Sequence, residues 1–357
     1  MSQRAILVAV DVRSREYPIE PELEEFEALA QAAGARIVER IVQRRDKVDP
    51  ATLVGSGKAR EIAERATALR ADLLLVLNDL RPRQRNNLEK TIPLPIVDRT
   101  MLILDVFARH ARSREGKLQV EMAQLRYRQS NLIGVGADLS RLGGGIGTRG
   151  PGETKLEVDR RRIGARITVL RRLLAGVRRQ RAVRRTSRHR EPLVALVGYT
   201  NVGKSSLLNA LARSDAHVAD QPFATLDPTI RRAYLAPGAF VRIADTVGFI
   251  TDLPEDLVNA FSATLEELRE ADLLLHVLDA SDPQWLRQSR AVEGILRELQ
   301  VDGTPRLTVF NKCDRLVREA ADEAGALYVS ALTGDGLPEL RAALATRLES
   351  LNRAATS

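Results

Sequence analysis

The sequence GYTNVGKS at residues 198–205 matches the phosphate-loop pattern, in which a glycine and four further residues precede Gly-Lys-Ser. An apolar run at 193–197, predicted to be a buried parallel strand, comes before it, and a predicted helix at 206–212 follows. A strand, a glycine loop and a helix in this order direct backbone N–H groups and a helix N-terminus at one point. The stretch therefore predicts an α/β domain with a polyphosphate site.

Two side chains of this loop carry specific chemistry. Lys204 is predicted to contact the outer phosphates as a point charge, and the Ser205 hydroxyl is predicted to bind Mg²⁺. The remaining loop residues and the next residue are predicted to surround the phosphates: Gly198, Tyr199, Thr200, Asn201, Val202, Gly203 and Ser206. The alternative is a glycine turn without a ligand, and the agreement of strand, glycines, Lys-Ser and helix argues against it.

Length and composition place the chain among globular proteins of several domains. Its 357 residues predict two or three domains, with 44% hydrophobic and 29% charged residues. No apolar run approaches the roughly 20 residues of a membrane span, and the run at 5–10 is too short for a signal peptide. The single cysteine, Cys313, excludes internal disulfides and is consistent with the cytosol. With four histidines beside it, a structural zinc site is not expected.

Positive charge is concentrated in one segment. Residues 160–190 contain thirteen arginines and no acidic residue. The charge of this segment, +13, exceeds the net charge of +8 of the whole chain. The rest of the chain is therefore net negative. A concentrated arginine row is typical of a surface that binds a phosphate backbone, and a solvated helix face is the alternative. Because only 4% of residues are aromatic, RNA recognised through its backbone and shape is favoured over base stacking.

Residues 1–112 are predicted to form a small α/β domain. Strands are expected at 5–12, 36–43, 72–77 and 96–97, and helices at 21–33, 58–69 and 82–90. The domain contains Gly55-Ser56-Gly57-Lys58, which could suggest a second nucleotide loop. No Ser or Thr follows Lys58, and no strong strand precedes the glycines. A tight turn that opens a helix is the favoured interpretation.

Residues 113–190 are predicted to form an antiparallel helical hairpin. Apolar residues at heptad spacing run from Leu118 to Leu132, with Gln129 as one polar position, and again from Ile163 to Val177. Between them lies a glycine-rich segment at 134–152, flanked by charge from Arg141 and Arg149. Helices of this length would hold the segment about 20 Å from the nearest domain. A disordered linker is the alternative, and the paired apolar seams argue against it.

Residues 191–357 supply further parts of a nucleotide site. Thr225, twenty residues after Ser205, is predicted to be a switch threonine that binds Mg²⁺ when the γ-phosphate is present, and Thr229 is the competing candidate. A hairpin of strands at 232–235 and 240–244 is predicted to end in Asp245, Thr246, Val247 and Gly248. Asp245 is placed to hold a Mg²⁺-bound water, and the Gly248 N–H to reach the γ-phosphate.

A predicted strand at 306–310 delivers Asn311, Lys312, Cys313 and Asp314. The Asp314 carboxylate can accept hydrogen bonds from the ring N–H and 2-amino group of guanine, donors that adenine lacks. Asn311 can reach N7, and the Lys312 stem can lie along the base. One more strand ends at Ser330, Ala331 and Leu332, which brings the Ala331 N–H near guanine O6. Four motifs in this order at strand ends predict a guanine-nucleotide domain with a mostly parallel, doubly wound sheet.

These motifs resemble the G-domain of translation-factor-related phosphate-loop GTPases. The segments IVDRT at 96–100, EGKLQVEMAQL at 115–125 and GGGIGTRGPGETKLE at 143–157 resemble the HflX family of cytoplasmic, ribosome-associated GTPases, over nearly the whole chain. The resemblance implies GTP and GDP as ligands, Mg²⁺ on Ser205 and Thr225, and catalytic roles for Lys204, Thr225 and Gly248. It also implies that a loop lies along the nucleotide: Phe223, Ala224, Thr225, Leu226 and Asp227.

For partners, the resemblance implies the large ribosomal subunit and its rRNA near the peptidyl-transferase region, with a role in separating or rescuing stalled ribosomes. The free protein is expected to be monomeric. Some family members carry an extra C-terminal domain, for which residues 336–357 leave room for one helix only. The alternatives are a nucleotide-gated RNA-binding protein and an ATP-dependent RNA remodeller that uses the N-terminal domain.

Phe249 occupies the position at which many GTPases have a glutamine that orients the attacking water. A phenyl ring cannot orient water by hydrogen bonding. The sequence therefore predicts slow intrinsic hydrolysis of GTP that a partner accelerates.

Overall fold

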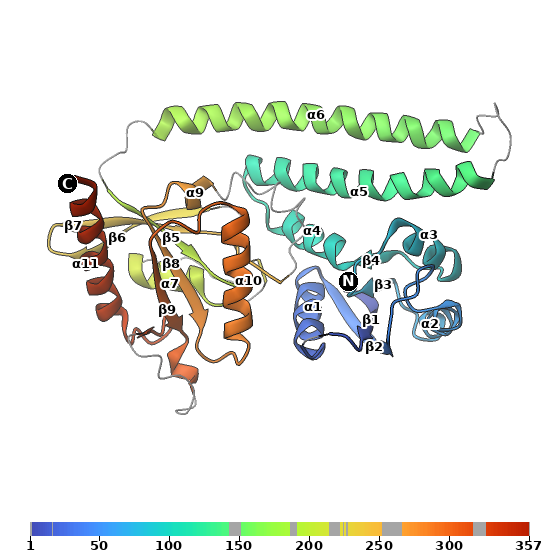
Figure 1. Ribbon diagram of the computed structural model, residues 1–357, viewed down its shortest axis with the longest axis horizontal. Helices are drawn as coiled ribbons and strands as arrows, with labels where there is room; N and C mark the ends of the chain where they lie inside the picture. The colour runs from blue at the N-terminus through green and yellow to red at the C-terminus, as the bar shows by residue number, and fades with distance from the viewer. Residues whose placement is uncertain are drawn as a thin grey trace. The chain divides into compact units, whose positions relative to one another are not determined.

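The computed structural model describes residues 2–15, 17–142, 151–185, 191–213, 222–223, 225, 228–251, 266–316 and 326–356. They form two compact units (Figure 1). The N-terminal unit comprises Met1–Arg109 and Lys117–Ala175, and the C-terminal unit comprises His110–Gly116 and Gly176–Ser357. In these described ranges, no helix has both the length and the apolar character that a membrane span requires.

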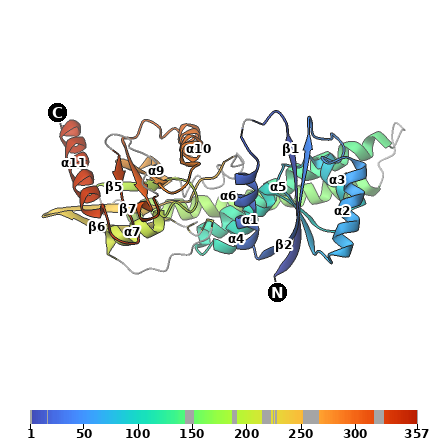
Figure 2. The ribbon, with the colours of Figure 1, turned by 90° about the horizontal axis from the view of Figure 1, so that it is seen from below.

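The N-terminal unit contains a parallel sheet in the order β2-β1-β3-β4. Its strands are β1 (Gln3–Val12), β2 (Ala35–Arg45), β3 (Leu73–Val76) and β4 (Ile96–Asp98), and its helices are α1 (Glu20–Ala32), α2 (Ser56–Ala68), α3 (Pro82–Thr91) and α4 (Arg99–His110). Figure 2 shows α1 and α4 against one face of the sheet and α2 and α3 against the other. The predicted α/β elements are confirmed, and α4 is an additional helix.

The buried strand β1 lies at the centre of this sheet because six consecutive apolar residues, 5–10, can be buried on both faces. Ile6, Val8 and Val10 alternate onto the face that packs against Ile62 of α2 and Leu88 of α3. Strand β1 therefore forms part of the hydrophobic core on this face of the sheet.

The helical hairpin consists of α5 (Arg114–Leu142) and α6 (Pro151–Arg185), which run antiparallel (Figure 1). The two predicted apolar seams meet, because the following residues form one cluster: Leu118, Met122, Leu125, Ile163, Ile167, Leu170 and Leu174. Of the glycine-rich segment predicted at 134–152, residues 134–142 belong to α5 and 151–152 to α6, so both helices extend further than predicted. Residues 143–150 lie outside the described residues.

The first half of α5 in the hairpin is attached to the N-terminal sheet, and the distance of about 20 Å predicted for the glycine-rich segment stays a prediction. Tyr127, fourteen residues into α5, donates a hydrogen bond to Asp98 at the end of β4. Arg85 of α3 pairs with the same carboxylate at 2.5 Å and also donates to the Tyr127 hydroxyl at 2.8 Å. This buried polar cluster fixes the first half of α5 to the α/β domain, and burial raises the pKa of Tyr127.

The C-terminal unit contains a six-stranded sheet in the order β10-β9-β8-β5-β7-β6, parallel except for the β6–β7 hairpin. Its strands are β5 (Leu193–Val197), β6 (Thr229–Ala236), β7 (Ala239–Asp245), β8 (Leu273–Asp279), β9 (Arg306–Asn311) and β10 (Leu327–Tyr328). Its helices are α7 (Lys204–Ala212), α9 (Glu266–Arg269), α10 (Trp285–Glu298) and α11 (Leu337–Thr356), with a 3₁₀ turn at Cys313–Arg315.

Helices α7 and α10 lie on opposite faces of this sheet (Figure 2), as in a doubly wound fold. The predicted mostly parallel sheet and the predicted hairpin are confirmed. Strand β8 has no counterpart in the sequence predictions, although it lies at the centre of the sheet between β5 and β9.

Candidate nucleotide site

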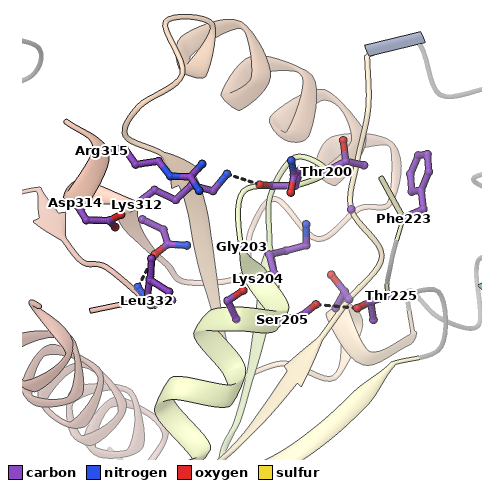
Figure 3. A pocket seen from close by; sticks show the side chains of 16 residues that line it. Thr200, Gly203, Lys204, Ser205, Phe223, Thr225, Lys312, Asp314, Arg315 and Leu332 are labelled. Atoms are coloured by element: carbon purple, nitrogen blue, oxygen red, sulfur yellow. Dashed lines mark hydrogen bonds between the residues drawn. The ribbon is translucent and has the colours of Figure 1, made fainter. Parts of the chain in front are cut away.

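A cavity of about 240 Å³ opens at the carboxyl ends of β5, β7 and β9 (Figure 3). Most of its lining was predicted from the sequence: Thr200, Asn201, Gly203, Lys204, Ser205, Ser206, Phe223, Thr225, Thr246, Gly248, Asn311, Lys312, Asp314, Ala331 and Leu332. Arg315 also lines it and was not predicted. Other predicted residues lie next to the cavity in the same loops or strands without lining it: Gly198, Tyr199, Val202, Asp245, Val247, Cys313 and Ser330. Ala224, Leu226 and Asp227 lie outside the described residues.

The phosphate loop connects β5 to α7 through backbone conformations that require glycine. Gly203 has φ of +89°, and a side chain there would collide with the Asn311 amide. Helix α7 begins at the next residue, Lys204, so its first N–H groups face the cavity.

Lys204 is buried at 6% exposure and donates from Nζ to the carbonyls of Gly198 at 3.0 Å and Tyr199 at 2.7 Å. Burial lowers the pKa of its ammonium to about 8, against the opposing effect of the Asp245 carboxylate. A bound polyphosphate would stabilise the charged form, so this lysine is suited to an anionic ligand.

Three oxygen-bearing side chains that could bind a metal ion converge at one corner of the cavity. The Ser205 and Thr225 hydroxyls lie 2.8 Å apart (Figure 3), and each donates to Asp245 Oδ2, at 2.6 and 2.8 Å. Among the described residues Asp245 Oδ1 has no hydrogen-bond partner, although the side chain is buried. Burial raises the pKa of this carboxyl, and both hydroxyls oppose that shift.

This donor set fits Mg²⁺, which prefers hard oxygen ligands and keeps several waters. Of the two candidate threonines, Thr225 is the one that contacts Ser205 and Asp245. Thr229 is exposed at the start of β6. The geometry therefore favours Thr225 as the candidate ligand.

The segment after β7 is hydrogen-bonded to the phosphate loop. The Thr200 N–H donates to the Phe249 carbonyl at 2.8 Å, and the Phe249 N–H donates to the Gly198 carbonyl at 3.1 Å. The Tyr199 hydroxyl lies 3.0 Å from the Thr251 hydroxyl. The Phe249 ring is buried at 2% exposure, which makes it a packing residue in this structure.

The candidate base-recognition loop is connected to the phosphate loop by Asn311. Its Nδ2 donates to the Val202 carbonyl at 2.9 Å, and its Oδ1 accepts from the Ala331 N–H at 3.0 Å. The Asp314 carboxylate accepts from the Ser330 hydroxyl. Because the Ala331 N–H is donated to Asn311, its predicted bond to guanine O6 stays a prediction.

The Gly55 turn of the N-terminal unit also has a glycine with positive φ before a helix, but its lysine has different surroundings. Gly55 has φ of +85° and precedes α2, which begins at Ser56. Lys58 is part of that helix and pairs with Glu61 at 2.7 Å. The interpretation as a tight turn opening a helix is confirmed.

Comparison with known families covers most of the chain. Residues 20–108 match a family described as GTP-binding GTPase N-terminal, 110–188 match the GTP-binding GTPase middle region, and 193–312 match the 50S ribosome-binding GTPase. The GTPase HflX of Caldanaerobacter subterraneus subsp. tengcongensis is 48% identical over 348 residues, covering 97% of this chain and 81% of that protein. The chain belongs to the HflX family.

A second HflX protein, from Escherichia coli, is 46% identical over 336 residues, covering 92% of this chain and 79% of its own length. A crystal structure of an SsGBP–GDP complex superposes with a TM-score of 0.53 at 24% identity, covering 97% and 99% of the two chains, and it supports the fold. HflX proteins are GTP-hydrolysing enzymes of the phosphate-loop class, and so is this one. GTPases of this kind are generally Mg²⁺-dependent.

The sequence analysis of this HflX protein missed the buried polar residues of β8. Asp279 and His276 lie in the run LLLHVLD, in which every residue is buried. Such a run has neither alternation nor a recognised motif. The signal that could have found Asp279 is its position at the carboxyl end of a buried parallel strand, beside the phosphate loop.

Proposed function

We propose that the protein is a Mg²⁺-dependent GTPase of the cytoplasm that binds the large ribosomal subunit and its rRNA and acts in ribosome splitting, rescue or recycling. The single observation that carries the RNA contact is the arginine face of α6, defined by Arg160, Arg161, Arg162, Arg166, Arg171 and Arg172. All six are exposed, and Val169 is exposed beside them, while Ile167 and Leu170 are buried against α5.

Part of this face retains uncompensated charge. Arg166 is paired with Glu121 at 2.7 Å, whereas Arg171 and Arg172 form no ion pair among the described residues. Adjacent unpaired guanidinium groups on one helix suit the phosphates of a structured RNA. The family match described as 50S ribosome-binding supports the large subunit as the source of that RNA.

In the proposed hydrolysis, Ser205 and Thr225 would hold Mg²⁺ and Asp245 would hold it through a water. The ion would neutralise charge on the β- and γ-phosphates. Lys204 would exchange its carbonyl partners for phosphate oxygens, and the Gly248 N–H would face the γ-phosphate. The glutamine position is held by the buried Phe249, whose phenyl ring cannot orient a water by hydrogen bonding. We therefore expect slow intrinsic hydrolysis that the ribosome accelerates.

Co-sedimentation tests the ribosomal role. The protein should pellet with large subunits in the presence of a non-hydrolysable GTP analogue and less so with GDP. Arg171→Glu/Arg172→Glu should weaken binding and reduce the dependence of log affinity on log salt by about two phosphate contacts. The exposed Arg347 and Arg353 of α11, changed in the same way, provide the control. Equal binding of the α6 variant and wild type would refute the proposed contact.

Single-turnover hydrolysis of GTP with and without large subunits tests the rate. A slow rate for the isolated protein and acceleration by large subunits are expected. Fast hydrolysis by the isolated protein that ribosomes leave unchanged would contradict the role given to Phe249.

A further inference from the structure

Asp279 ends β8 and is buried at 8% exposure beside the candidate nucleotide site. Its two carboxylate oxygens have different partners. Oδ2 lies 2.6 Å from Lys312 Nζ. Oδ1 accepts from the Ser281 N–H at 2.9 Å and from the Ser281 hydroxyl at 2.7 Å. One oxygen of the carboxylate is therefore fixed by its own loop, and the other pairs with the Lys312 ammonium.

Lys312 has a second partner in the phosphate loop. Its Nζ donates to the Asn201 carbonyl at 2.7 Å, so the ammonium bridges the loop after β8 and the phosphate loop. Its backbone is in the left-handed region, with φ of +62°. The Lys312 stem crosses above Gly203, where Cε lies 3.9 Å from the position of an added Cβ.

This bridge determines where the lysine stem can be. An unpaired lysine side chain is flexible, with a strongly hydrated charge at the end of a four-carbon stem. Such a side chain samples many rotamers and would pack poorly against a ligand. A buried carboxylate on one side and a carbonyl on the other select one rotamer. The stem then lines the cavity next to Asp314, which is the predicted base-recognition residue.

We infer that Asp279 is a positioning residue for the nucleotide: it holds the Lys312 stem as one wall of the base pocket and thereby slows nucleotide release. The inference rests on the proposed assignment of this cavity to a guanine nucleotide. The simpler role is a turn cap, since the Ser281 bonds form a local Asx turn. The two roles differ in whether the effect of Asp279 passes through Lys312.

Asp279→Asn separates them. The asparagine keeps the size and the Oδ1 acceptor for Ser281, but it places an amide group against the Lys312 ammonium. In stopped-flow displacement of a fluorescent GDP from the full chain, release should accelerate about tenfold, the loss expected for a charge-assisted hydrogen bond. Asp279→Glu, which keeps the negative charge, should release GDP more slowly than Asp279→Asn.

Asp282→Asn is the matched control. This aspartate belongs to the same loop and accepts from the Gln284 N–H at 2.8 Å and Gln288 Nε2 at 2.7 Å, both in or beside α10. It does not line the cavity. Its replacement should leave GDP release unchanged, even if it lowers the melting temperature.

A double-mutant cycle with Lys312→Ala provides the decisive result. If Asp279 acts through Lys312, Asp279→Asn should add little to the release rate of the Lys312→Ala protein. An undiminished acceleration in that background would overturn the inference in favour of a turn cap, as would wild-type release by Asp279→Asn alone. If Lys312→Ala itself leaves GDP binding unchanged, the assignment of the cavity to a nucleotide fails instead.

Discussion

The two units each place a glycine-lysine turn before a helix on a parallel sheet, but the surroundings of the two lysines differ. Lys204 is buried and donates to backbone carbonyls in its own loop. The Lys58 side chain is 25% exposed and is neutralised by Glu61 one turn along α2. A phosphate ligand can recruit the first lysine without breaking an ion pair, whereas it would have to compete with a carboxylate for the second.

The aspartates at the strand ends differ in the same way. Asp98 at the end of β4 is occupied by Arg85, Tyr127 and the Met101 N–H. Asp245 at the end of β7 faces only hydroxyl donors on Oδ2, and its Oδ1 has no partner among the described residues. Similar topology therefore supports a structural joint in one unit and a ligand site in the other.

The largest expected effect comes from the two lysines. Lys204→Ala should weaken GTP binding by about 10³-fold, because it removes a buried cation from the phosphates. Lys58→Ala should leave GTP binding unchanged. Equilibrium titration with a fluorescent GTP analogue measures both. A comparable loss in Lys58→Ala would show that the N-terminal turn also holds the nucleotide.

The two aspartates should separate activity from stability. Asp245→Asn should lower Mg²⁺-dependent hydrolysis on the order of 100-fold, since the ion stabilises charge in the transition state. Asp98→Asn should leave hydrolysis intact but destabilise the N-terminal unit by about 3–5 kcal/mol, because Arg85 becomes a buried cation without its counter-charge. Turnover assays across a Mg²⁺ series and thermal unfolding measure these effects. Loss of hydrolysis in Asp98→Asn would contradict the division of roles.

The free energy of unfolding of the C-terminal unit should depend on pH through a buried histidine, His276. Burial, then the charges of Arg306 and Lys204, lower the pKa of His276 to about 4. The unfolded chain therefore binds more protons between pH 4 and 6.5, and stability should rise with pH across that window by roughly 3 kcal/mol. His276→Asn should flatten this dependence.

Urea unfolding followed by tryptophan fluorescence measures this effect in the right unit, because Trp285 is the single tryptophan and packs edge-on against Phe310. If the free energy of unfolding of His276→Asn depends on pH between 4.5 and 7 as steeply as that of wild type, other groups cause the loss of stability in acid.

The smallest expected effect is the uptake of a fraction of a proton by Lys204 when GTP binds. Free Lys204 has a pKa of about 8, and bound phosphates should raise it. GTP affinity should therefore fall as pH rises above 8, by about tenfold per unit while the free lysine is neutral and the bound one is charged. Calorimetry at pH 8.5 in two buffers of different ionisation enthalpy should show uptake of about three-quarters of a proton. No uptake would mean that the lysine is already charged in the free protein.

The strand, glycine loop and helix around residues 198–205 were predicted well because their determinants are local. Gly203, Lys204 and Ser205 are consecutive, and Gly203 has the left-handed backbone that its residue type allows, while the ligand roles of Lys204 and Ser205 stay predictions. The β6–β7 hairpin was predicted for the same reason, since Pro237 and Gly238 lie between two short apolar runs.

Long-range contacts account for what the sequence analysis did not predict. The joint between Asp98 and Tyr127 connects residues 29 positions apart, and nothing in either segment identifies its partner. The hydrogen bond from the Ala331 N–H to Asn311 Oδ1 was likewise not predicted, since it joins two loops twenty residues apart. Strand β8 and Asp279 were missed because no recognised motif adjoins the run LLLHVLD, whereas the equally buried β5 was identified by the phosphate loop that follows it.

The central claim is that the C-terminal unit reads guanine through Asp314, and isothermal titration calorimetry of wild type and Asp314→Asn with GTP, ATP and XTP tests it most directly. Xanthine presents a carbonyl where guanine has its 2-amino group, so an asparagine amide can donate to it. The account predicts that wild type takes up GTP in strong preference to ATP and XTP, and that Asp314→Asn prefers XTP. Equal uptake of ATP and GTP by wild type, or an unchanged preference in the variant, would contradict it.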